Sequence, residues 1–87
     1  MKVVAKPIDM VAWFDKKGVP NPVRFKVDGE GGESIVIKID KIITRDKEKL
    51  AGNPMLIFNC QGCVNGTQKL FEIKYELSTC KWILYKI

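Results

Sequence analysis

Residues 56–77 read LIFNCQGCVNGTQKLFEIKYEL, with Asn65-Gly66 near the centre. Both residues of this pair accept the left-handed backbone conformation that a two-residue type I′ turn requires, so the pair is a strong hairpin signal. Apolar residues alternate with polar ones on both sides of it, which is the period of strands with one buried face. The stretch therefore predicts two antiparallel strands. Their apolar positions are Leu56, Phe58 and Cys60 before the turn and Phe71, Ile73, Tyr75 and Leu77 after it.

Two further strands precede this hairpin. In Val23-Arg24-Phe25-Lys26-Val27 the cations alternate with apolar residues, which predicts a half-buried strand with both cations on its polar face. The acidic, glycine-rich segment 28–33 tolerates positive φ and predicts a hairpin tip. The apolar alternation of Ile35, Ile37 and Ile39 then changes phase at 41–43, where we predict a β-bulge.

The remaining apolar segments lie towards the two ends. Residues 8–14 follow Pro7 and predict a strand with both faces partly covered, and residues 82–87 form the last strand. The segment 45–52 holds the only run of helix formers, and Gly52 and Pro54 stop it. At most one or two helical turns fit there, and they would need packing to be stable.

Six strands joined mostly by short turns, with no helix long enough for a crossover, must be largely antiparallel. A meander of this size exposes its edges unless it curls. The expected fold is therefore all-β: about six mostly antiparallel strands in a strongly bent sheet or a partly open small barrel, as a single domain over residues 1–87. The alternative is a flatter sheet with 45–52 packed across one face.

Composition limits the compartment and the chemistry. An odd number of cysteines, three, fits a reducing compartment, and no apolar run approaches the roughly 20 residues that cross a bilayer. We expect a cytoplasmic protein that does not enter the membrane. Histidine is absent, which removes the commonest general base and the commonest zinc ligand. We therefore expect no enzyme, no cofactor and no metal.

The cysteines include a CxxC, Cys60-Gln61-Gly62-Cys63. A structural zinc site usually takes four Cys or His ligands, whereas this chain has three thiols and no histidine. Strand positions three apart point to opposite faces, so these two thiols should diverge. We expect Cys60 in the core and both Cys63 and Cys80 in turns.

Positive charge is concentrated in the first third of the chain. The net charge is +5, from 15 Lys and Arg against 10 Asp and Glu, and much of the excess lies before residue 28, beside aromatic residues. Cations next to aromatic rings are what single-strand binders use to hold phosphates and stack bases. The other interpretation is a solvated surface, with most of Trp13, Phe14, Trp82 and Tyr85 in the core. The candidate binding residues are Trp13, Lys16, Lys17, Arg24 and Lys26.

Arg24 carries two alternatives of its own. An arginine on a sheet can offer its planar guanidinium to a phosphate or carboxylate of a partner. It can equally form a cross-strand ion pair within the chain, with an acid such as Asp40 or Glu72.

The landmarks also follow an order seen in one bacterial group. They are Pro7-Ile8, Gly18-x-Pro20, Val23-Arg24-Phe25, the strand 37–43, Phe58, Phe71-Glu72-Ile73-Lys74-Tyr75 and Trp82-Ile83-Leu84. In this order the chain resembles the small bacterial all-β domains of unknown function encoded beside Y-family translesion DNA polymerases. The longer acidic tip and the cysteine-containing strand depart from that pattern. The resemblance implies the same small all-β fold and the context of an accessory or interaction module in DNA-damage tolerance.

We therefore expect a noncatalytic binding module. Its expected partner is a protein, with a DNA polymerase or another replication factor as the candidate, contacted through an apolar patch or an exposed strand edge. The alternative is a small β domain that binds nucleic acid nonspecifically through its basic strand face. A third interpretation is a structural homodimer, and we expect a monomer or a weak homodimer.

Overall fold

The computed structural model describes all 87 residues and contains six β-strands and no helix. The strands are β1 (Val3–Phe14), β2 (Pro20–Asp28), β3 (Ser34–Leu50), β4 (Asn53–Val64), β5 (Thr67–Glu76) and β6 (Lys81–Lys86). Each strand pairs antiparallel with the next, and β1 also pairs with β6, so the meander closes into a barrel. The all-β prediction is confirmed. None of its elements is a helix that could cross a membrane.

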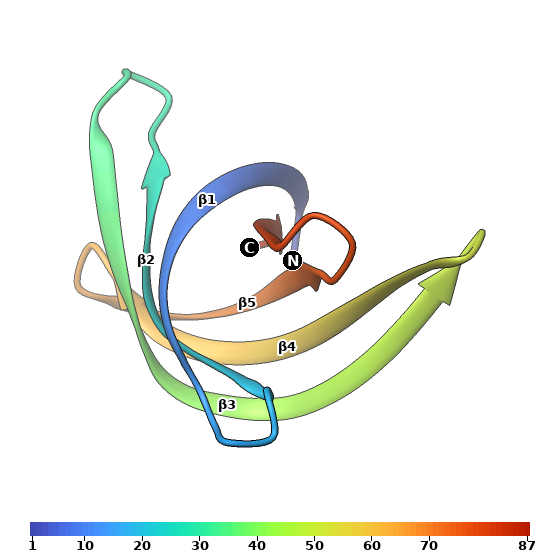
Figure 1. Ribbon diagram of the computed structural model, residues 1–87. Helices are drawn as coiled ribbons and strands as arrows, with labels where there is room; N and C mark the ends of the chain where they lie inside the picture. Colours follow the sequence, from blue (N-terminus) through green and yellow to red (C-terminus); the bar gives the residue numbers. More distant parts are fainter.

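Two long strands bend so that each takes part in both halves of the barrel (Figure 1). β1 pairs with β6 over residues 3–8 and with β2 over residues 9–14. β3 pairs with β2 over residues 34–38 and with β4 from residue 39 onward. The register of β3 shifts between Ile39 and Lys41 and again between Ile42 and Thr44, which confirms the bulge predicted at 41–43. These irregularities let the sheet curl far enough to close.

Gly62 lies at the corner where β3 leaves β2 and joins β4. It is the register partner of Ile39. A Cβ atom at this position would lie 2.4 Å from the carbonyl oxygen of Lys38 and 3.0 Å from the ring of Phe71. Glycine therefore allows the backbones of β3 and β4 to approach closely where the barrel turns.

The inward faces of five strands, β2 to β6, supply a core of ten buried apolar residues. Phe25 meets Phe71 edge to face at 5.5 Å between ring centroids, and Tyr75 packs on Trp82 at 4.6 Å. The whole set is Phe25, Val27, Ile37, Phe58, Cys60, Phe71, Ile73, Tyr75, Trp82 and Leu84. The alternations read from residues 23–27 and 71–75 thus correctly identified the faces of β2 and β5.

Both predicted hairpin turns are present. Asn65 and Gly66 both have positive φ, 51° and 79°, and join β4 to β5. At the β2–β3 tip the backbone N–H of Gly29 donates to the carbonyl of Glu33 at 2.7 Å. This tip rises above the barrel in Figure 1.

The segment 45–52, where the sequence allowed at most one or two helical turns, contains no helical turn. β3 continues through it and pairs with β4 at every residue from Arg45, opposite Phe58, to Leu50, opposite Asn53. Ala51 and Gly52, both with positive φ, form the turn. A continuous ladder with β4 overrides the weak helix preference of so short a segment. The resulting β3–β4 hairpin projects to the right of the barrel in Figure 1.

Candidate functional site

Three neighbouring strands share one exposed face, because alternate residues of each strand point away from the core. We call this surface the basic face. Its members are Asp9, Val11 and Trp13 on β1, Arg24 and Lys26 on β2, and Val36 and Lys38 on β3.

Cross-strand register sets the neighbours on the basic face. Val11, Arg24 and Lys38 are partners in one row, and Asp9, Lys26 and Val36 are partners in the next. Directly opposite side chains have Cβ atoms about 4.5–5.5 Å apart. Two cations, Arg24 and Lys38, therefore face each other across the β2–β3 pair.

Acids do not neutralise this opposed pair. The structure has two ion pairs, and neither involves Arg24 or Lys38. The ion pair that the sequence allowed between Arg24 and Asp40 or Glu72 is not formed. Lys26 Nζ lies 3.9 Å from Asp9 Oδ2, but both side chains are more than half exposed, so this pair contributes only about 0–1 kcal/mol.

Two aromatic residues lie at the end of β1, Trp13 on the basic face and Phe14 next to it. Trp13 is 58% exposed and Phe14 is 49% exposed, so the interpretation that most of the four aromatic residues Trp13, Phe14, Trp82 and Tyr85 lie in the core is wrong. Trp82 occupies the core instead, and Tyr85 is half-buried. Trp13 shares the outward phase of Val11 along β1, whereas Phe14 meets Tyr75 edge to face at 6.0 Å.

The β1–β2 turn adds two further cations at the same end of the hairpin. Asp15 Oδ1 accepts hydrogen bonds from the backbone N–H groups of Lys17 at 2.8 Å and Val19 at 2.9 Å, which orders the turn. The side chains of Lys16 and Lys17 are exposed. A shallow hollow of about 240 Å³ lies among Asp9, Met10, Val11, Arg24, Phe25, Lys26 and Val36.

All five residues proposed from the sequence thus lie exposed on the β1–β2 hairpin, three on the strands and two in the turn. Three residues that complete the face from both sides were not predicted from the sequence: Lys38, Val11 and Val36. The available signal was the length of the segment between β2 and β3, because it sets the register that brings Lys38 opposite Arg24.

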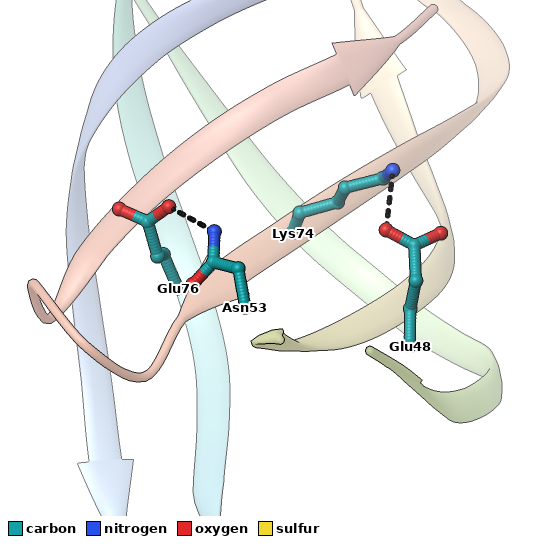
Figure 2. Close-up of polar contacts among 4 residues, drawn as sticks. All are labelled: Glu48, Asn53, Lys74 and Glu76. Atoms are coloured by element: carbon teal, nitrogen blue, oxygen red, sulfur yellow. Dashed lines mark hydrogen bonds and ion pairs between the residues drawn. The ribbon is translucent and has the colours of Figure 1, made fainter. Parts of the chain in front are cut away.

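A second surface is the groove between the projecting β3–β4 hairpin and the outer side of β5 and β6, with a volume of about 530 Å³. Lys74, 8% exposed, places its Nζ 3.2 Å from Glu48 Oε2 and 3.8 Å from the ring centroid of Tyr85. Asn53 donates to Glu76 Oε2 at 2.8 Å (Figure 2). The charged residues of this groove are two acids, Glu48 and Glu76, and two lysines, Lys74 and Lys81, so the groove has no net charge to select a ligand.

Glu76 at the rim of this groove is held as a carboxylate. The hydroxyl of Thr79 and the amide of Asn53 donate to it, and these hydrogen bonds lower the pKa of Glu76 from its ordinary value. The group therefore connects the β5–β6 turn to the start of β4.

Closure of the barrel leaves little strand edge for a partner. Beyond Lys38, β3 pairs with β4 alone, and residues 45–49 of this edge are all charged. Arg45 also donates to the carbonyl of Pro20 at 3.1 Å and to Asn21 Oδ1 at 2.8 Å. Charged residues along an edge oppose the addition of another strand. The free edge of β3 is therefore poorly suited to the strand-edge contact with a partner that we expected from the sequence.

The cysteines occupy three different environments. Cys60 is buried in the core, and burial raises the pKa of its thiol to about 12. Cys63 is exposed on β4, not in a turn as expected, and Cys80 is exposed in the β5–β6 turn. The two thiols of the CxxC diverge as predicted. No group of three or more His, Cys, Asp or Glu side chains is arranged to hold a metal ion.

Comparisons of the chain with protein-family models, with curated proteins and with solved structures find no significant match.

Proposed function

We propose that the protein is a noncatalytic module that binds single-stranded nucleic acid on the basic face. The observation that carries this proposal is the direct opposition of Arg24 and Lys38 without an acid between them. Like charges directly opposite each other destabilise a strand pair. A phosphate bound between the two cations would replace this repulsion with two attractions.

The neighbouring residues suit the same ligand. Arg24 offers a planar guanidinium that can contact two phosphate oxygens at once, and Lys38 acts as a point charge beside it. Trp13 presents an exposed ring on which an unpaired base can stack. Stacking of this kind requires a base that is not already inside a duplex, which favours single strands.

The turn extends the positive surface. Lys16 and Lys17 lie beyond Trp13 along the hairpin, so a strand passing from the β3 side to the turn would meet cations before and after the ring. Backbone contacts of this type carry no sequence information, so we expect binding without sequence preference. This activity suits the accessory role in DNA-damage tolerance that the resemblance implies, and a contact with a polymerase remains a separate proposal.

The test is fluorescence anisotropy with a labelled oligothymidylate of about 12 nucleotides, a length within the site sizes of small β-barrel binders. We expect binding at about 50 mM salt that Arg24→Ala and Trp13→Ala each weaken and that rising salt weakens steeply. Lys49→Ala is the matched control, because it removes one exposed cation from the β3–β4 hairpin. Absence of binding at low salt, or equal loss in Lys49→Ala and Arg24→Ala, would refute the proposal.

A further inference from the structure

A cavity of about 310 Å³ opens at the end of the barrel beneath the β2–β3 tip. We call it the mouth cavity. Its walls are apolar side chains that point into the barrel from five of the six strands, and from the C-terminal residue. They are Val4, Val27, Ile35, Ile37, Val64, Leu84 and Ile87. No aromatic side chain is among them.

The rim of the mouth cavity is acidic. It carries the carboxylates of Asp28, Glu30 and Glu33 and one ammonium, that of Lys6. Lys6 Nζ donates to the backbone carbonyl of Asp28 at 3.2 Å, and neither ion pair of the structure includes a rim carboxylate. Three carboxylates against one ammonium leave the rim with two net negative charges, although the whole chain carries +5.

We infer that the mouth cavity binds an aliphatic ammonium. The apolar stem of such a ligand would occupy the cavity, and its cationic end would remain at the carboxylate rim. The volume lies at the lower end of the range for small-ligand sites, which suits an unbranched chain rather than a ring system. The absence of aromatic walls disfavours recognition of a quaternary ammonium, which uses ring faces.

Two sources can supply this chemistry. One is a free alkylamine, and the other is the side chain of a lysine in a basic protein segment. Both present a short methylene stem that ends in an ammonium, so they make the same contacts inside the cavity. They differ in what remains outside the rim: nothing further for a free alkylamine, and the polypeptide backbone for a lysine side chain.

This inference goes beyond the proposed function, because it uses other residues and the opposite charge. The mouth cavity and the basic face share no lining residue. Arg24→Ala should therefore weaken oligonucleotide binding and leave ammonium binding unchanged.

The test is calorimetric titration of the full chain with 1-aminobutane, 1-aminopentane and 1-aminohexane. Each added methylene should raise the affinity about fourfold, because burial of one methylene contributes a constant free energy. Hexanoate, with the same stem and the opposite charge, should bind far more weakly. A titration with Nα-acetyl-lysine amide separates the sources: binding equal to that of 1-aminobutane assigns the lysine side chain, and no binding assigns the free amine.

Variants locate the site. Glu30 and Glu33 are exposed in the β2–β3 turn. The double variant Glu30→Gln/Glu33→Gln should therefore weaken 1-aminohexane binding without changing the melting temperature. Lys49→Ala should have no effect. Equal binding of hexanoate and 1-aminohexane, affinity that does not depend on stem length, or no heat with any of the amines would overturn the inference.

Discussion

The opposition of Arg24 and Lys38 predicts that one substitution will stabilise the protein and weaken its binding at the same time. Lys38→Glu converts a repulsive cross-strand pair into an attractive one, because the two residues are register partners on an exposed face. The same change removes a cation from the basic face. Stability and affinity should therefore move in opposite directions.

The size of the effect follows from the register. Two unit charges at the Cβ spacing of about 5 Å interact in water by about 0.8 kcal/mol, so reversing one sign changes the energy by at most about 1.6 kcal/mol without salt, because flexible side chains let like charges move apart. A Debye length of about 8 Å at physiological salt reduces this gain to about 0.9 kcal/mol, and one of about 3 Å at 1 M salt reduces it to about 0.3 kcal/mol.

Urea denaturation and calorimetry at both salt concentrations measure this gain. About 0.9 kcal/mol corresponds to a rise in melting temperature of about 4–7 °C for a chain of this size. Lys38→Gln, which removes the repulsion without adding attraction, should give about half of it. For oligonucleotide binding, the five cations of the basic face and the turn predict a slope of log affinity against log salt of about −3.5, and the loss of one predicts about −2.8. These cations are Lys16, Lys17, Arg24, Lys26 and Lys38. A neutral or destabilised Lys38→Glu at low salt would contradict the register argument, and unchanged affinity would contradict the proposed binding face.

Three further predictions concern the rest of the barrel. Gly62→Ala should cost about 1–3 kcal/mol in urea denaturation, because its Cβ would lie 2.4 Å from the carbonyl oxygen of Lys38, and an unchanged midpoint would contradict the close approach. A thiol reagent at about pH 8 should label two cysteines of the folded protein, Cys63 and Cys80, as counted by mass spectrometry. Cys60 should be spared, because it is buried and its pKa of about 12 keeps it protonated. Labelling of all three cysteines without denaturant would contradict this. Folding lowers the pKa of Glu76 from its ordinary value of 4.5, so the stabilising effect of its carboxylate is present above pH 4.5 and is lost as pH falls through the folded pKa. Glu76→Gln should therefore be less stable than the wild type at neutral pH and equally stable in acid. A stability difference that persists in acid would contradict this sign.

Local patterns predicted most of the fold. The alternation in residues 23–27 and 71–75, the Asn65-Gly66 turn and the phase change at 41–43 each depend on neighbours in the sequence, and each is present in the structure. The strand over residues 45–50 was not predicted, because the helix formers of this segment are also tolerated on a solvated strand. Six residue pairs with β4, from Arg45 to Leu50, decide the structure of that segment, and such pairing is not visible from the segment itself.

The candidate site was predicted only in part for a related reason. The polar phase of Arg24 and Lys26 could be read from one strand, but the charge opposite Arg24 depends on the register of another. Trp13 shows a different limit. Its outward phase relative to Met10 and Ala12 was readable, yet its size favoured the core in a chain with few aromatic residues. The core is formed instead by residues of the five other strands.

Positive and negative charges are separated along β2, with the cations of the basic face before the acids of the tip. Lys26 and Asp28 are two residues apart on β2, which is about 7 Å along a strand and less than the Debye length at physiological salt. The acidic tip is therefore close enough to act on a polyanion at the near end of the basic face, around Lys26. The acidic tip repels a polyanion that approaches from the mouth end and leaves the opposite end, with Trp13 and the two lysines of the β1–β2 turn, as the favoured point of first contact. A nucleic-acid strand bound to the basic face should thus extend towards that turn and away from the mouth cavity, which remains free for a cationic ligand.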